Sequence, residues 1–86
     1  MKKVKGGKVT TEVERQDLIE DGKIETIMVL THVTIYNLGD SEINIVINNG
    51  DDIPLEAGEG LSFGELKISS LKVVEVGSTV KFMGIC

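Results

Sequence analysis

The chain lacks tryptophan and has one cysteine, one proline and three aromatic residues among its 86 residues. Since the only cysteine is Cys86, no disulfide can form within the chain, and we expect a passive free thiol there rather than a bridge to a second chain. The longest apolar run, 27–30, has four residues, far fewer than the roughly 20 that cross a bilayer. No apolar segment of a secretion signal follows the first lysines. We therefore expect no membrane span, no membrane partner and no export.

The scarcity of aromatic side chains leaves the core to other residues. Apolar residues make up 41% of the chain and aromatics only 3%, namely Tyr36, Phe63 and Phe82. The core must therefore consist of valine, isoleucine and leucine. β-branched side chains lose rotamer freedom in a helix and pack well on a pleated sheet, so this composition favours strands.

Positive charge is concentrated at the start of an otherwise acidic chain. The net charge is −5, and four lysines in the first eight residues contribute +4, which leaves −9 for the rest. Gly6 and Gly7 lie among these lysines, and glycine makes a terminal segment flexible. We predict a flexible basic N-terminal arm over residues 1–8, followed by a single β-sandwich domain over residues 9–86. The acidic domain should repel phosphate backbones, so specific nucleic-acid binding is not expected.

The segment after the arm predicts a long N-terminal hairpin. Apolar and polar residues alternate from Val9 onward, and Asp21-Gly22 supplies the two central residues of a type I′ turn. With that turn setting the register, Val13 lies opposite Leu30. The alternative is a helix over 11–21, but the apolar residues there form no continuous stripe.

Glycine-rich turns separate short strands in the rest of the chain. Strands are predicted at 23–36, 42–48, 53–55, 61–64, 66–69, 71–76 and 79–85. Pro54 cannot donate to a ladder, so its strand should lie at a sheet edge. Val73 and Val74 break the alternation of their strand and predict a bulge. About eight antiparallel strands without a helix predict an all-β domain, either a small β-sandwich or a partly open barrel.

The strand over 23–36 predicts self-association. Strict alternation places apolar side chains on both of its faces. A domain of this size cannot easily bury both faces of one strand, so a second chain should cover the remaining face. We therefore predict a homo-oligomer. The predicted interface consists of five apolar side chains: Met28, Leu30, Tyr36, Val46 and Met83.

The groups that enzyme chemistry needs are missing from the sequence. His32 is the only histidine, and the only cysteine is more than fifty positions away, so no metal or catalytic pair is expected between them. No serine lies in a Gly-x-Ser-x-Gly elbow. The glycines of 58–64 lack the lysine and the following helix of a phosphate-binding loop. We predict no catalytic residue, no cofactor and a structural role for His32.

Four carboxylates crowd one region of the chain: Asp51, Asp52, Glu56 and Glu59. Carboxylate oxygens are calcium ligands, but this spacing does not match an EF-hand loop, and acidic side chains at turns are usually solvated. We predict no metal site and leave calcium binding at these four residues open.

Three stretches resemble a pattern found in small phage and prophage virion proteins. The pattern is a strand ending in Asn-x-Gly, an alternating strand, and a corner of the form x-Pro-Leu-x-x-Gly-Glu, here over 33–39, 43–50 and 53–59. The segment 77–85 is similar to the terminal strand of that family, so the resemblance covers residues 33–85. It implies a β-sandwich that decorates a capsid or sits on a tail and binds its neighbours. No functional residue carries over, because the matched positions are structural corners.

The expected function is structural. We expect a non-enzymatic phage or prophage protein that is made in the cytoplasm of a bacterial host, is not secreted, and joins a virion by binding itself and other virion proteins. The alternative is a β-sandwich module that binds a small ligand or a carbohydrate through loops at one end. Such a module would present aromatic side chains near those loops, and Tyr36 and Phe63 are the candidates.

Overall fold

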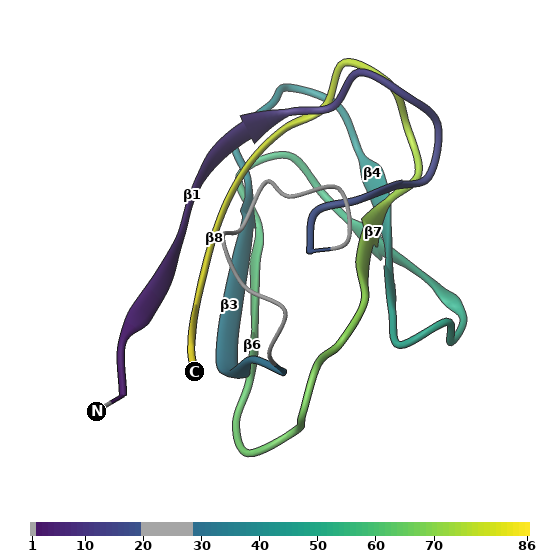
Figure 1. The fold of residues 1–86 in the computed structure, drawn as a ribbon. Helices are drawn as coiled ribbons and strands as arrows, with labels where there is room; N and C mark the ends of the chain where they lie inside the picture. The colour runs from purple at the N-terminus through teal and green to yellow at the C-terminus, as the bar shows by residue number, and fades with distance from the viewer. Residues whose placement is uncertain (1, 20–28) are drawn as a thin grey trace.

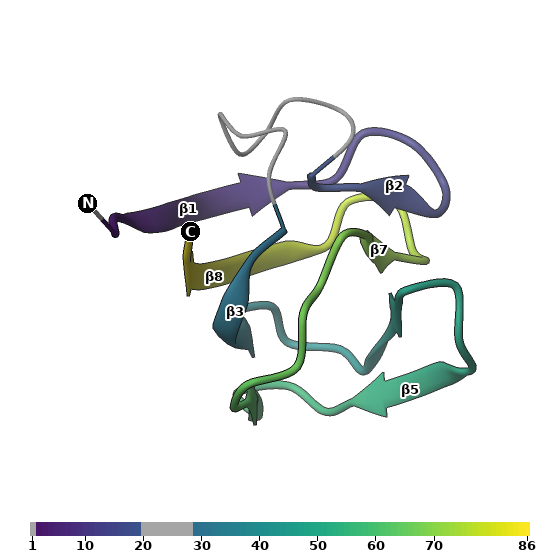
Figure 2. The ribbon, with the colours of Figure 1, turned by 60° about the horizontal axis from the view of Figure 1, so that its bottom comes forward.

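A computed structural model describes residues 2–19 and 29–86, which form eight strands and no helix. The strands are β1 (Val4–Thr10), β2 (Gln16–Asp17), β3 (Thr31–Asn37), β4 (Ile43–Ile47), β5 (Asp52–Leu55), β6 (Gly60–Phe63), β7 (Leu71–Val73) and β8 (Thr79–Ile85). They build two antiparallel sheets, the first sheet in the order β1-β8-β3-β6 and the second sheet in the order β2-β7-β4-β5 (Figures 1 and 2). The prediction of an all-β fold, a small antiparallel sandwich of about eight strands, is confirmed.

Several strands lie where the sequence predicts them. β8 has the predicted bounds, and β4 lies within the predicted 42–48. β5, which contains Pro54, is an edge strand of the second sheet. The predicted strand over 66–69 is wrong, because Ile68 makes only an isolated bridge there. β7 ends at Val73 with a continuous register to β4, so the predicted bulge at that point is also wrong.

The predicted N-terminal hairpin falls partly outside the described residues, because its turn and the first part of its returning strand belong to 20–28. In the described part, the predicted pairing of Val13 with Leu30 is wrong. Leu30 instead exchanges backbone hydrogen bonds with Ile68 at 3.0 and 2.8 Å, while β2 pairs with β7. The alternative helix is not found over 11–19, where the chain turns and forms β2.

The core lies between the two sheets. It consists of apolar residues from both sheets and their connections: Leu18, Ile19, Leu30, Val33, Ile35, Ile43, Ile45, Leu55, Ile68, Leu71, Val73, Val80 and Phe82. Among these residues only Phe82 is aromatic, as the composition predicts. Side chains of this kind contribute stability roughly in proportion to the apolar area that they remove from water.

A β-bulge in β3 decides which side chains of that strand face the core. The register between β3 and β8 shifts in the first half of β3, where His32 adopts a φ of 52°. One extra residue reverses the alternation of side chains along a strand. As a result Leu30, Val33 and Ile35 are all 0% exposed, whereas Tyr36 points outward. Strict alternation predicts apolar side chains on both faces of the segment 30–36, but the bulge turns several of them toward the core. The prediction of a surface position for Leu30 is therefore wrong.

The prediction of a flexible arm is wrong for residues 4–8. These residues belong to β1, which pairs with β8 along its whole length, beginning with Val4 opposite Ile85. Just before the strand, the backbones of Lys3 and Cys86 exchange hydrogen bonds at 2.9 and 3.1 Å. The first and last strands of the described chain therefore lie side by side (Figure 1).

The glycine at position 6 is required by the close approach of β1 to β8. A Cβ at Gly6 would collide with the backbone carbonyl of Phe82 and lie 2.7 Å from the Cα of Met83. Glycine removes that obstacle. Gly6 suggests a flexible terminus in the sequence, but in the fold it allows β1 to pair with β8.

Replacing Gly6 by alanine is expected to loosen the pairing of β1 with β8. The cost should be about 1–3 kcal/mol of unfolding free energy, as for other methyl groups forced into filled space. Gly7→Ala is the matched control, because a Cβ at Gly7 meets no atom within 4 Å. Urea denaturation followed by circular dichroism measures both variants. Equal stability of the two would contradict a steric role for Gly6.

Asn37 joins the two sheets at the end of β3. Its fully buried side-chain amide donates to the backbone carbonyls of Ser41 at 2.8 Å and Leu55 at 3.0 Å, and its Oδ1 accepts from the N–H of Gly39 at 3.0 Å. Leu55 belongs to β5, so these bonds connect the first sheet to the second. Only an amide offers two donors and an acceptor in this shape.

Candidate functional site

The first sheet turns one side toward the core and the other toward solvent. Side chains alternate along a strand, so the register of the four strands determines which residues share the solvent side. We call this side the outer face. It consists of Val4, Gly6, Lys8 and Thr10 of β1, Thr79, Lys81, Met83 and Ile85 of β8, Thr31, Thr34 and Tyr36 of β3, and Gly60 and Ser62 of β6.

Apolar side chains reach solvent on the outer face. Val4 is 71% exposed and Tyr36 is 40% exposed, and Met83 and Ile85 are half-buried. Val4 lies opposite Ile85 in register, and Met83 is two residues from Ile85 on the same side of β8. Exposed apolar side chains that gather on one surface mark binding sites more often than scattered ones do.

The ring of Tyr36 lies against β6. Tyr36 and Gly60 are register partners, and a Cβ at Gly60 would lie 2.5 Å from Cδ1 and 2.6 Å from Cε1 of that ring. The glycine therefore leaves the space that the ring occupies. An aromatic side chain with few rotatable bonds loses little entropy when it binds a partner, so Tyr36 is well placed as a contact residue.

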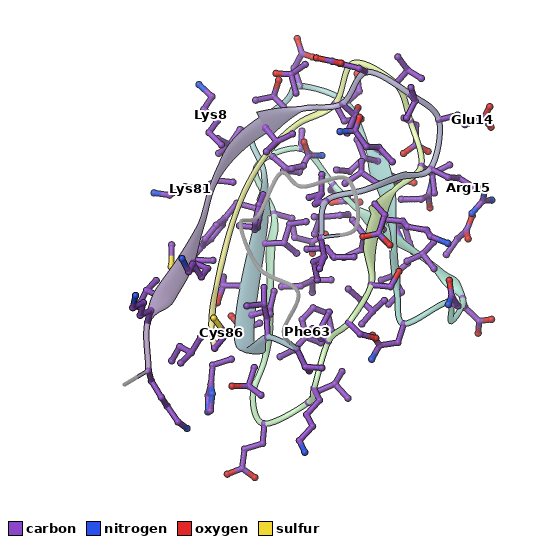
Figure 3. The ribbon with its side chains drawn as sticks, viewed as in Figure 1. Lys8, Glu14, Arg15, Phe63, Lys81 and Cys86 are labelled. Atoms are coloured by element: carbon purple, nitrogen blue, oxygen red, sulfur yellow. The ribbon has the colours of Figure 1, made fainter. Side chains whose placement is uncertain are left out.

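Two lysines lie side by side on the outer face. Lys8 of β1 and Lys81 of β8 are register partners, both are exposed, and both project from the same side of the first sheet (Figure 3). The ion pair of the described residues joins Arg15 to Asp52, so neither lysine has an acidic partner among them. Like charges directly opposite each other on adjacent strands destabilise a sheet.

Charge is segregated in the fold. The four strands of the first sheet contain Lys5, Lys8 and Lys81 and no acidic residue, and Lys2 and Lys3 precede β1. All 14 acidic residues of the chain lie in other segments. Since the net charge is −5, these five lysines leave −10 for the remaining residues. The first sheet is therefore the basic part of an acidic protein.

Replacing Lys8 by glutamate is expected to stabilise the isolated domain by roughly 0.2–1 kcal/mol, because a repulsive cross-strand pair becomes an attractive one. The gain should shrink at high salt, which screens surface charges. Thermal unfolding at two ionic strengths measures it. Lys72→Glu is the control, since Lys72 lies on the second sheet and donates to Asn49 at 2.9 Å. A loss of stability in Lys8→Glu at low salt would mean that the lysine pair is not unfavourable.

The five predicted interface residues do not share one surface. Tyr36 and Met83 lie on the outer face. Leu30 is 0% exposed and Val46 is 4% exposed, so the chain itself covers both, and their assignment to a surface is wrong. Met28 lies outside the described residues.

Sequence reasoning missed Val4, Lys8 and Lys81 as members of one surface. The first two were assigned to a flexible arm, and Lys81 joins them only because β1 pairs with β8. This pairing connects opposite ends of the sequence, and no local sequence pattern in either strand predicts which strand it pairs with. The like-charged lysines would even argue against it.

Polar side chains flank Val46 on the outward side of the second sheet. Its register partners are Asp52 and Lys72. Arg15 binds Asp52 with 3.3 Å between Nη2 and Oδ2, and both side chains are about half exposed, 52% and 45%. The hydrogen bond to Asp52, and then its charge, raise the pKa of the Arg15 guanidinium. An exposed ion pair adds little stability, but the stems of long charged side chains can cover apolar surface, and Val46 between such neighbours is 4% exposed.

The carboxylates considered for calcium take part in local contacts. Glu59 Oε1 accepts a hydrogen bond from the backbone N–H of Glu56 at 2.9 Å, and Asp52 binds Arg15. Within residues 2–19 and 29–86, no group of three or more acidic, histidine or cysteine side chains is placed to hold a metal ion.

Neither the lone histidine nor the lone cysteine is part of the outer face. His32 is exposed at the bulge, where its backbone N–H donates to the carbonyl of Gly64 at 2.7 Å and its Nδ1 lies 3.2 Å from the Thr31 hydroxyl. Cys86 is half-buried and packs against the core. Both residues therefore contribute to the fold.

A hollow lies between the loops 37–43 and 75–79, and we call it the acidic hollow. Its lining includes Asp40, Glu42, Glu75 and Val76 and no aromatic residue. Glu75 accepts hydrogen bonds from the backbone and side-chain N–H groups of Asn44 at 2.7 and 2.8 Å. Small-ligand pockets are mostly lined by apolar and aromatic side chains, so this hollow gives the ligand-binding alternative no support.

Comparison with known proteins does not assign this chain to a class. No protein-family model matches the chain, and no curated protein matches it. In the described part of the chain, no helix is both long enough and apolar enough to span a membrane. The all-β sandwich and its outer face are therefore the basis for the proposed function.

Proposed function

We propose that this chain is a non-enzymatic structural protein of a phage or prophage particle, and that it works by binding neighbouring protein subunits. The observation that carries the proposal is the outer face. There, apolar side chains that reach solvent share one face with two lysines that lack an acidic partner among the described residues. The lysine pair costs stability in the isolated domain. A complementary protein surface would cover the apolar groups and neutralise the lysines.

The resemblance of residues 33–85 to phage virion proteins supports the particle as the place of action. Two of its matched stretches are corners of this fold. The Asn-x-Gly stretch ends β3 at Asn37, whose side chain connects the sheets, and the Pro-Leu-x-x-Gly-Glu stretch connects β5 to β6. A protein that presents one broad face from a rigid sandwich suits decoration of a capsid or a tail.

Particles released by the bacterial strain that carries this sequence provide the test. After purification on a density gradient, quantitative mass spectrometry should find the chain in a fixed number of copies per particle. Antibodies against the chain should label those particles in electron micrographs. An abundant host protein serves as the control and should be lost during purification. Particles without the chain, together with a strictly monomeric purified protein, would overturn the proposal.

A further inference from the structure

We infer that the outer face of one copy binds the acidic hollow of a second copy, so that subunits join head to tail. This inference rests on the proposed function, because it names the surface and the partner through which the subunits associate. The two surfaces differ, so each copy offers one of each and can bind two neighbours. Such a contact either closes into a ring or continues as a chain of subunits.

The two surfaces are complementary in charge and in apolar character. The outer face presents Lys8 and Lys81, and the acidic hollow presents Asp40 and Glu42 beside Val76, which is 60% exposed. Neither Asp40 nor Glu42 takes part in an ion pair within the described residues. The stem of a lysine packs on apolar surface while its ammonium group reaches polar partners. A hollow with an exposed valine between carboxylates fits that side chain.

The two surfaces adjoin at Thr79, which belongs to the outer face and also lines the acidic hollow, but no ion pair joins them within the described residues of one copy. Lys8 and Lys81 project sideways from the first sheet (Figure 3), whereas the loops of the acidic hollow meet at the end of the sandwich away from the two termini (Figure 1). Within the described residues, the charges of both surfaces are therefore left for a second copy to neutralise.

Three other ways of pairing two copies are opposed by residues of this chain. Outer face against outer face, about a two-fold axis, would bring Lys8 and Lys81 against the same lysines of the second copy. Strand addition along the edge of β1 is discouraged by Lys5 and Lys8, because lysines on an edge strand hinder further pairing. Along β5, Pro54 has no N–H to donate. A head-to-tail contact meets none of these obstacles.

Two charge-reversed variants test the inference. Lys8→Glu with Lys81→Glu reverses the outer face and keeps a like-charged pair, so the fold should change little. Asp40→Lys with Glu42→Lys reverses the acidic hollow. Each variant alone is expected to self-associate at least about tenfold more weakly than the wild type, because facing charges now repel. Sedimentation equilibrium and light scattering over a range of concentrations measure the association.

An equimolar mixture of the two variants should assemble again. In the mixture, lysines face carboxylates at every contact, provided that the two variants alternate. Assembly that returns only on mixing is expected for a head-to-tail contact between these two surfaces. A mixture that stays dissociated would overturn the inference.

Lys67→Glu with Lys72→Glu is the matched control. It makes the same change in net charge, but these lysines lie in the β6–β7 loop and in β7, away from the outer face. This variant should associate like the wild type. If it loses association as strongly as the outer-face variant, net charge and not the proposed contact governs assembly, and the inference fails.

The remaining outcomes separate this inference from the proposed function. A wild-type protein that stays monomeric, or an outer-face variant that assembles normally, overturns the head-to-tail contact. If the chain is still found in purified particles, the proposed function stands. If the outer-face variant instead loses binding to a single-stranded oligonucleotide while its self-association is unchanged, the lysines serve a nucleic acid, and the inference is overturned in favour of that partner.

Discussion

A chain that carries Leu30→Asp should be largely unfolded at neutral pH. Leu30 is 0% exposed, and it packs so closely beside Gly84 that a Cβ there would lie 3.2 Å from the Cβ of Leu30. Burying an unpaired carboxylate costs several kcal/mol. Proteins of this size have a total stability of only about 4–13 kcal/mol. The substitution therefore removes most or all of the stability, which urea denaturation and circular dichroism will show.

Met83→Asp is the matched control for Leu30→Asp. Met83 is half-buried on the outer face, where a carboxylate keeps much of its water. We expect a change of less than about 1 kcal/mol in the free energy of unfolding and a weaker self-association in light scattering. A Leu30→Asp protein that folds normally but no longer associates would mean that Leu30 is a surface residue after all.

Asn37→Asp is expected to cost at least about 3 kcal/mol at neutral pH, although the two side chains have nearly the same shape. The amide of Asn37 donates to the carbonyls of Ser41 and Leu55. A carboxylate has no hydrogen to donate, so it would face two carbonyl oxygens in a fully buried place. Both the charge and the lost donors destabilise the folded state.

The cost of Asn37→Asp should depend on pH. Burial and the facing carbonyl oxygens favour the protonated form, so the pKa of the new carboxyl is raised in the folded state relative to the unfolded state. The penalty is therefore largest above the folded pKa and shrinks as pH falls through it. Urea denaturation at several pH values measures the stability difference from the wild type.

Asn49→Asp is the control, because Asn49 is exposed at the β4–β5 turn and accepts a hydrogen bond from Lys72. A carboxylate can accept that bond as well, so we expect a change of less than about 0.5 kcal/mol. If the destabilisation by Asn37→Asp were equally small, or did not change with pH, the hydrogen bonds of Asn37 would not support the corner between the sheets.

The strands that could be predicted are those with a local signal at both ends. β8 follows the turn at Gly77-Ser78 and alternates to its end, and its bounds were predicted correctly. Pro54 places β5 at an edge because the missing N–H is a property of that residue alone. These features depend on short stretches of sequence, so no knowledge of the partner strands is needed.

The errors at Leu30 and at β1 have a different origin. The bulge at His32 reverses the alternation of side chains along β3, and the residue types around it do not predict an extra residue. In the sequence, Gly6 suggests a flexible segment. In the fold, a glycine is required at this position because the backbone of β8 passes too close for a side chain. In both cases the cause is a contact with β8, about 50 or more residues further along the chain. The outer face, which depends on that contact, could therefore be predicted only through Tyr36 and Met83.

The central position of β8 in the first sheet affects how the protein can fold as it is synthesised. β1 and β3 emerge from the ribosome well before the strand that lies between them, so neither can pair with it until residue 85 has been made. Bringing such distant segments together carries an entropic cost, and folds of this kind take roughly milliseconds to seconds to form. During that interval the unpaired strands are open to other nascent chains. The yield of native protein should therefore rise when fewer chains are made at the same time or when chaperones are abundant.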